Sequence, residues 1–181
     1  CGAGLPIYWN ALPHTGVQLK LDRGGGVTVF CGEIDIGQGS DTVLAMTVAE
    51  ILGIDTYDIR VVYGDTDLTP VDLGSYSSRV TLMMGNAAIQ AAERARELIT
   101  KAVAEKLEIP GNRIGFADRR VFDVQDPDNG MAFREAVVHA EAKFGTIGTV
   151  GSYTPPASPG RYKGAGVGPS PAYSYSAAVV E

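Results

Sequence analysis

The chain has 181 residues, of which 45% are hydrophobic and 20% are charged, and its formal net charge is −6. This composition is typical of one globular domain that buries a core without help from disulfides. The sequence has no dense run of Lys and Arg, which argues against a nucleic-acid partner. It also has no apolar run of about 18 residues, which argues against a membrane span.

Cysteine and histidine usage argues against a metal site. Cys1 and Cys31 lie far apart, and no CxxC pair occurs. His14 and His139 stand alone without partners at ligand spacing, so the sequence predicts no zinc or iron–sulfur site in this chain. Cys31 lies in an apolar run and is expected to be a buried free thiol, which favours a cytoplasmic location.

The first half of the chain predicts a hairpin, a helix and a further strand. Val17, Leu19 and Leu21 alternate with polar residues, as in a half-buried strand. A glycine-rich turn and a second apolar run follow, so the two strands are expected to pair. Ser40 or Asp41 is expected to cap the helix. The expected ranges are a covering segment at 1–14, strands at 16–22, 27–36 and 57–63, and a helix at 40–52.

The second half predicts a long helix whose apolar stripe is mostly alanine. The stripe residues lie three or four apart and share one face, so this helix can pack closely on a sheet or on another helix. They are Met84, Ala87, Ala91, Ala95, Leu98 and Ala102. The expected ranges are a polar loop at 64–79, the long helix to about 107, a hairpin at 113–124, a helix at 131–143, a strand at 145–153, a Pro/Gly loop at 154–171 and a last strand at 172–181.

The order of these elements, β-β-α-β-α-β-β-α-β-β, mixes hairpins with helical crossovers. It predicts an α+β fold in which helices pack on a mixed, mainly antiparallel sheet. No internal repeat divides the chain, so residues 1–181 are expected to form a single domain or part of one.

The stretch Gly37-Gln38-Gly39-Ser40 lies where a predicted strand leads into a helix. Free N–H groups at a helix N-terminus attract anions, and glycine lets the backbone approach a ligand closely. The Gln38 amide can donate and accept at once, so the loop suits a phosphate or the edge of a heteroaromatic ring. It lacks the spacing of a P-loop and of the dinucleotide GxGxxG motif, and a plain tight turn is the alternative.

A second loop at a helix N-terminus, residues 74–81, carries three serines and an arginine. The hydroxyl groups of Ser75, Ser77 and Ser78 and the planar guanidinium of Arg79 suit a phosphate. The alternative is an elaborate N-cap in which one serine satisfies the first turn and the arginine is solvated.

Other candidates are weaker. Residues 160–173 resemble an anion loop, but a flexible entry to a strand is the better interpretation. Asp65 and Asp67 are interpreted as turn acids, and Glu33 and Asp35 as strand residues that face solvent or a loop. No GxSxG motif and no convincing Ser/His/Asp set occurs, so no catalytic residue is assigned.

Three stretches together resemble the molybdenum-cofactor subunit of the xanthine dehydrogenase/aldehyde oxidase family. They are GEIDIGQGSDTVLAMTVAEILGI, IRVVYGDTDLTP and GSYSSRVTLMMGNAAIQAA. The resemblance covers about residues 15–181 and is strongest over 33–92. Within the family it is closest to the 4-hydroxybenzoyl-CoA reductase branch, through DIGQGS, LTP and GSYSSRVT.

The resemblance implies that the two loops hold the pterin and the phosphates of molybdopterin cytosine dinucleotide, which carries molybdenum. It also implies a molybdenum-dependent oxidoreductase that acts on an aromatic or heteroaromatic small molecule, or on an aromatic acyl-CoA. Iron–sulfur clusters and FAD are then expected on other domains or subunits. The implied cofactor-binding residues are Gly37, Gln38, Gly39 and Ser40 in the first loop, and Ser75, Tyr76, Ser77, Ser78 and Arg79 in the second.

The family's catalytic base is a Glu further toward the C-terminus than this chain reaches, and no Glu here matches it. The chain begins without Met and ends within a predicted strand, so we expect a piece of a longer large subunit that is inactive alone. Its expected partners are the rest of that subunit and the iron–sulfur and FAD subunits. Two alternatives stay open, namely a separately encoded non-catalytic subunit and an anion-binding module without molybdenum. Gln38→Ala and Arg79→Ala are expected to lower cofactor occupancy more than thermal stability.

Overall fold

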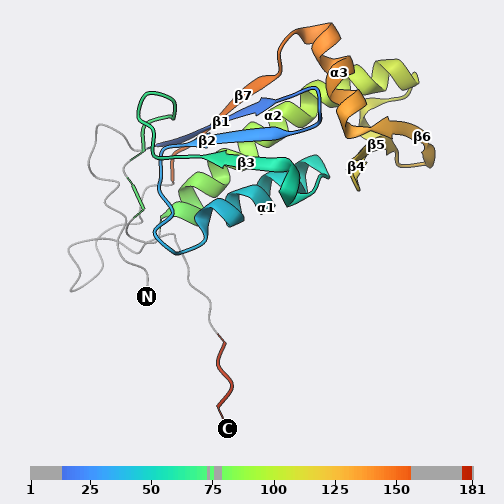
Figure 1. The fold of residues 1–181 in the computed structure, drawn as a ribbon. Helices are drawn as coiled ribbons and strands as arrows, with labels where there is room; N and C mark the ends of the chain where they lie inside the picture. Colours follow the sequence, from blue (N-terminus) through green and yellow to red (C-terminus); the bar gives the residue numbers. More distant parts are fainter. Residues whose placement is uncertain (1–13, 73, 76–78, 156–176, 181) are drawn as a thin grey trace.

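The computed structural model describes residues 14–72, 74–75, 79–155 and 177–180. Within these residues the chain forms two sheets and three α-helices, an α+β architecture that confirms the predicted fold class (Figure 1). The strands are β1 (Thr15–Leu21), β2 (Val27–Cys31), β3 (Ile59–Val62), β4 (Ile114–Ala117), β5 (Arg120–Asp123), β6 (Asp126–Ala132) and β7 (Gly148–Tyr153). The helices are α1 (Ser40–Leu52), α2 (Val80–Leu107) and α3 (Phe133–Phe144), and short 3-10 turns precede β3 and β4.

The larger sheet has the strand order β3-β2-β1-β7 and is mixed, as predicted. β1 pairs antiparallel with both β2 and β7, whereas β3 joins β2 in parallel after the α1 crossover. Val17, Leu19 and Leu21 are buried, and the alternate residues Gln18 and Lys20 are exposed. The predicted period of two is therefore confirmed, and it directs one face of the sheet toward the helices.

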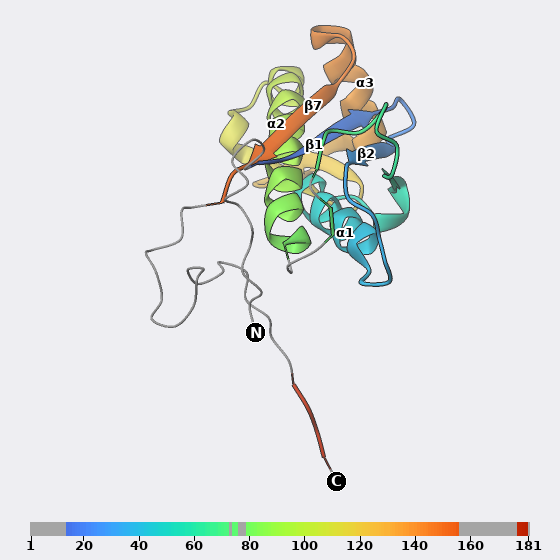
Figure 2. The same ribbon diagram turned by 90° about the vertical axis from the view of Figure 1, so that its left-hand side faces the viewer.

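Helices α1 and α2 cover that face (Figures 1 and 2). The predicted alanine stripe of α2 packs against β7, β1 and α1. The approach is so close that a Cβ on Gly151 in β7 would lie 1.9 Å from the carbonyl oxygen of Ala87. Small side chains on both elements therefore let the helix backbone rest directly on the sheet.

The second strand ends earlier than the sequence predicts. β2 stops at Cys31 rather than at residue 36. A Cβ on Gly32 would lie 2.2 Å from the carbonyl oxygen of Pro70, because the segment before α2 crosses the chain at this point. That crossing displaces the expected strand continuation, and residues 33–39 form the loop that leads into α1.

The smaller sheet has the order β4-β5-β6 and packs beside α2 and α3. The hairpin of β4 and β5 is confirmed, but β6 was not predicted. Its sequence DPDNGMA is rich in residues that disfavour strands, and its pairing with β5 contains an irregularity at Phe122 and Asp123. Pairing with a neighbour, and not local preference, makes this segment a strand.

The predicted covering segment 1–14 and the Pro/Gly loop 154–171 lie almost wholly outside the described residues. Of the predicted last strand at 172–181, the described residues 177–180 have no regular secondary structure. Among the helices that the structure describes, none is long and apolar enough to cross a membrane.

Candidate functional site

The two loops that the sequence singles out meet at one end of the larger sheet. Both α1 and α2 begin there, on the left of Figure 1. The Ser75 hydroxyl donates to the carbonyl oxygen of Ile34 at 2.5 Å, and the Ile34 N–H donates to the Ser75 Oγ at 3.2 Å. The loop before α1 and the loop before α2 are thus joined through the backbone of one residue. We call this junction the two-loop site, formed by residues 31–41 and by the described residues of 70–79.

Two glycines shape the loop before α1. Gly37 and Gly39 have φ values of 101° and 76°, a region that suits glycine, and among the described residues no atom lies within 4 Å of a Cβ placed on either. The N-cap of α1 is Gly39, which has no side chain to cap the helix, so the expectation that Ser40 or Asp41 is the cap is wrong. The backbone of the loop therefore faces open space on the side of both glycines.

The Gln38 amide holds this loop in place. Its Nε2 donates to the carbonyl oxygen of Ile34 at 3.3 Å and to the Oγ of Ser40 at 3.0 Å. Its Oε1 accepts the N–H of Ile36 at 2.6 Å. Both amide hydrogens are used, whereas Oε1 keeps one lone pair, so the exposed side chain can accept one further hydrogen bond.

Asp35 supplies the negative charge at the start of α1. Its carboxylate accepts the N–H groups of Gly37 at 2.7 Å and Asp41 at 3.4 Å. These backbone donors, that of Gly37 first, hold the pKa of Asp35 below its usual value. In this conformation an internal carboxylate occupies the backbone donors that the sequence suggested for an external anion. The interpretation of Asp35 as a strand residue is wrong.

Arg79 and Asp72 form a buried ion pair under the second loop. The two side chains are 4% and 1% exposed, and the Arg79 Nη1 lies 2.6 Å from the Asp72 Oδ1. Arg79 also donates to the carbonyl oxygen of Gly74 and to the Thr15 Oγ1, each at 2.9 Å. The Thr15 hydroxyl in turn donates to Asp72 at 2.6 Å. The guanidinium that the sequence offered to a phosphate, or to solvent, thus ties the loop to β1.

Glu33 is the residue that the sequence interpretation missed. It is 2% exposed, and neither carboxylate oxygen has a hydrogen-bond partner among the described residues. Burial and the negative charge of Asp72 raise the pKa of Glu33 to about 7, although the Ser40 hydroxyl and Arg79 favour the charged form. The sequence predicts a strand residue that faces solvent or a loop, and this prediction is wrong. The early end of β2 turns Glu33 inward, and no sequence signal reports that turn.

Other sequence expectations hold in part. Cys31 is a buried free thiol, as predicted, and burial raises its pKa to about 12. Tyr76, Ser77 and Ser78 lie outside the described residues, so the structure says nothing of their place in the second loop. The part of the chain that the structure describes contains no group of three or more His, Cys, Asp or Glu suited to a metal ion.

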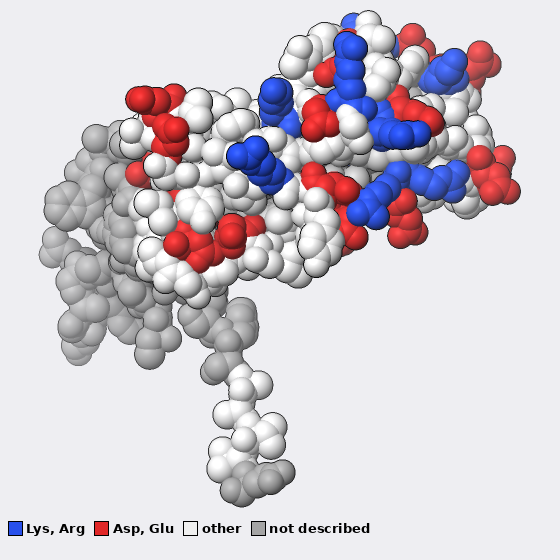
Figure 3. All heavy atoms as spheres, viewed as in Figure 1, with Lys and Arg blue, Asp and Glu red and all other residues white. Residues whose placement is uncertain are grey.

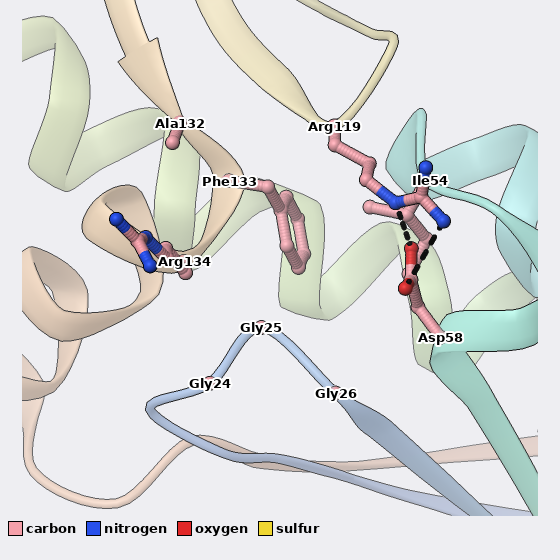
Figure 4. Close-up of a pocket in the computed structure, with 9 residues that line it drawn as sticks. All are labelled: Gly24, Gly25, Gly26, Ile54, Asp58, Arg119, Ala132, Phe133 and Arg134. Atoms are coloured by element: carbon pink, nitrogen blue, oxygen red, sulfur yellow. Dashed lines mark hydrogen bonds and ion pairs between the residues drawn. The ribbon is translucent and has the colours of Figure 1, made fainter.

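The opposite end of the larger sheet carries a cavity and a partly exposed ion pair. There a cavity of about 200 Å³ lies between the glycine turn 24–26, Phe133 and the ion pair of Arg119 and Asp58 (Figure 4). Arg134 lines the same cavity. On the face shown in Figure 3, Lys and Arg gather toward this end, whereas the coloured side chains nearest the grey region on the left are acidic.

Known proteins resemble most of the chain. The sequence profile of the family described as "Molybdopterin cofactor-binding domain" matches residues 1–181. The gamma subunit of the 6-hydroxypseudooxynicotine dehydrogenase complex of Paenarthrobacter nicotinovorans is 43% identical over 111 residues, which are 59% of this chain. The probable hypoxanthine oxidase XdhD of Escherichia coli K12 is 36% identical over 141 residues, which are 77% of this chain. Each match covers 14% of the relative's own length.

A solved structure shares the fold. The reconstituted CO dehydrogenase from Oligotropha carboxidovorans superposes with a TM-score of 0.74 and 26% sequence identity. The match covers 86% of this chain and 20% of the other chain. Most of this chain's fold therefore occurs within a much longer polypeptide.

Proposed function

The chain belongs to the molybdopterin cofactor-binding domain family, and on that premise we propose that its two-loop site holds part of the molybdenum cofactor of a larger oxidoreductase. Relatives named as dehydrogenases and oxidases support an oxidoreductase as the parent protein. Because the chain spans 14% of the two curated relatives, the activity of the whole protein is part of the proposal.

One observation carries the proposal. The two loops lie about forty residues apart in sequence, and the structure joins them through Ser75 and Ile34 at the N-termini of α1 and α2. Helix N-termini favour groups with negative charge. Gly37 and Gly39 also leave open space above the loop, as close approach of a ligand to the backbone requires. The open backbone beside Gly37 and Gly39 and the free acceptor of Gln38 therefore fit the heterocycle of a cofactor, whereas Asp35 accepts the Gly37 and Asp41 N–H groups in this conformation.

The described side chains have different roles in the proposed cofactor site. The Gln38 Oε1 keeps acceptor capacity for an N–H group of the cofactor, while the amide orders the loop. Asp35 fixes the start of α1, and Arg79 fixes the second loop from beneath through Asp72. When bound, the cofactor supplies the exchange of electrons and oxygen with a substrate, and the protein orients it. We assign no acid–base residue of that reaction to this chain.

Finer features of the parent protein are part of the same proposal. The cofactor is the cytosine dinucleotide form. Ser75, Tyr76, Ser77 and Ser78 complete the contacts of Gly37, Gln38 and Gly39, while Ser40 and Arg79, each 4% exposed, belong to the site by ordering the two loops. The substrate is an aromatic or heteroaromatic small molecule or an aromatic acyl-CoA, as in 4-hydroxybenzoyl-CoA reductases. Iron–sulfur and FAD groups lie elsewhere in a cytoplasmic complex. The name hypoxanthine oxidase supports a heteroaromatic substrate, and the name of a dehydrogenase complex subunit supports partner chains.

Metal and pterin analysis of the intact parent protein tests the proposal. We expect about one molybdenum atom per chain and the fluorescence of an oxidised pterin after denaturation. Nucleotide release on acid hydrolysis identifies the dinucleotide form. Active protein that contains neither molybdenum nor pterin would contradict the proposal and leave an anion-binding module as the remaining interpretation.

A further inference from the structure

Glu33 lies at the centre of the two-loop site, and its carboxylate oxygens have no hydrogen-bond partner among the residues that the structure describes. The Gln38 amide donates to the Ser40 Oγ, and Ser40, itself buried, lies beside Glu33 at the start of α1. On its other side Glu33 faces Asp72 and Arg79, the ion pair under the second loop. Its carboxyl group therefore sits between the structures that fix the first loop and those that fix the second.

The positive charge near Glu33 is not sufficient to neutralise an ionised Glu33 in addition to Asp72. Arg79 already pairs with Asp72, and Asp35 at the surface of the loop adds a further negative charge. The neighbouring Cys31 thiol stays neutral, because burial raises its pKa to about 12. A buried charge without a partner is expensive, so ionised Glu33 favours any conformation that admits water.

We propose that Glu33 is a positioning residue of the two-loop site, which keeps the two loops joined while its buried carboxyl group carries a proton. Loss of that proton to solvent places a second negative charge beside the Asp72–Arg79 pair. The junction of Ile34 and Ser75 then opens so that water reaches the carboxylate. The relevance of this opening to ligand retention rests on the proposed function, whereas the opening itself does not.

The direction of the pH dependence follows from the raised pKa. The folded junction binds the proton with a pKa of about 7, and an opened junction has a value near 4.5. The closed form is therefore favoured below pH 4.5, and this preference is lost as the pH rises to 7. Between pH 6 and pH 8.5 the equilibrium constant for opening increases about tenfold.

Hydrogen exchange on the intact protein measures this opening directly. The amides of Ile34 and Asp41 report on the junction, since they donate to Ser75 and Asp35. After correction for intrinsic exchange, we expect protection of the two junction amides to fall about tenfold from pH 6 to pH 8.5, and the Glu33→Gln variant provides the reference.

Glu33→Gln is the decisive variant, because it mimics the protonated carboxyl group at every pH. We expect it to keep junction protection constant between pH 6 and pH 8.5, while Glu50→Gln on the exposed side of α1 keeps the wild-type fall. Glu33→Asp, which still titrates, retains a pH-dependent fall and replaces Glu33→Gln as the test if that variant does not fold. Equal pH dependence in wild type and Glu33→Gln, or pH-independent protection in wild type or Glu33→Asp, overturns the inference.

Cofactor retention separates this inference from the proposed function. During dialysis at pH 8.5, we expect Glu33→Gln to lose molybdenum more slowly than wild type. Equal losses, with molybdenum present, overturn the link from Glu33 to the ligand. Absence of molybdenum from every variant overturns the proposed function, and the exchange result then still decides the role of Glu33 in the junction.

Discussion

The two ends of the larger sheet handle charge in opposite ways. At the two-loop site, the side chains of Asp72, Arg79 and Glu33 are buried, and within the described part of the chain Asp72 pairs with Arg79 whereas Glu33 has no hydrogen-bond partner. At the opposite end, Arg119 pairs with Asp58 near the surface, with side chains 54% and 28% exposed. Water screens the second pair and not the first, so similar chemical groups have very different energetic consequences.

The comparison indicates that the fold is locally less stable at the end of the sheet that carries the two-loop site. In the glycine turn at residues 22–26, the backbone groups form local hydrogen bonds with the side chain and the backbone of Asp22. The two-loop site needs contacts between β1, the loop before α1 and the loop before α2. Residues far apart in sequence must be ordered together there, which gives a binding surface whose stability depends on a few polar groups. Four substitutions test this difference.

Asp72→Ala should have the largest effect. It leaves the Arg79 guanidinium buried without its carboxylate, and we expect a loss of about 3–5 kcal/mol in the free energy of unfolding. Asp58→Ala at the opposite end removes a partly exposed ion pair and a hydrogen bond from the Asp55 N–H, and should cost about 1–2 kcal/mol. Urea denaturation of both variants measures the difference. Similar losses in the two variants would remove the contrast between the ends.

Glu33→Gln should change the dependence of stability on pH. The raised pKa of about 7 means that wild type gains stability as the pH falls from 7 toward 4.5. The free energy of unfolding of wild type changes through this group by about 3 kcal/mol between pH 4 and pH 8. The neutral glutamine removes this change. Denaturation at several pH values measures it, with Glu50→Gln as control. A wild-type slope that survives in Glu33→Gln would assign the effect to other groups.

Gly39→Ala should have a smaller effect that comes from the backbone alone. The φ value of 76° disfavours alanine by about 1–2 kcal/mol, and no neighbouring atom lies within 4 Å of the new Cβ. Gly111→Ala provides the matched control, because its Cβ would make an ordinary contact with Thr100 at 3.5 Å and its φ is not in the left-handed region. If both variants are equally stable, the loop adopts another conformation in solution.

Gln38→Ala should have the smallest effect on folding. Its side chain is exposed, and its three hydrogen bonds lie within one loop, so we expect a loss below about 1 kcal/mol by thermal denaturation. Arg79→Ala, which the sequence suggested as an equivalent test, is not equivalent, because Arg79 is buried and paired. A loss of several kcal/mol in Gln38→Ala would show that the loop is part of the structural core.

Much of the fold follows from patterns within single elements. The alternation of Val17, Leu19 and Leu21 predicts β1, and the alanine stripe predicts α2, because burial on one face leaves a period in the sequence. β6 was missed because its DPDNGMA sequence has no strand preference of its own. It becomes a strand through pairing with β5, and such pairing leaves no local pattern.

The site was predicted less completely than the fold. The glycines and Gln38 were found because a loop between a strand and a helix has a recognisable composition. The burial of Arg79 involves Asp72 and Thr15, of which Thr15 is far from it in sequence, and the inward turn of Glu33 follows the crossing of Pro70 over Gly32. That crossing brings together residues that are almost forty positions apart in the sequence. The composition of neither segment alone predicts this contact.

The molybdenum content of Gln38→Ala in the intact parent protein tests the central claim most directly. Loss of the amide removes an acceptor for the cofactor and loosens the loop, so we expect about a tenfold weaker hold on the cofactor with little change in thermal stability. Gln125→Ala, exposed in the turn between β5 and β6, should keep the wild-type molybdenum content. A Gln38→Ala protein that retains full molybdenum content would contradict the assignment of the two-loop site to the cofactor.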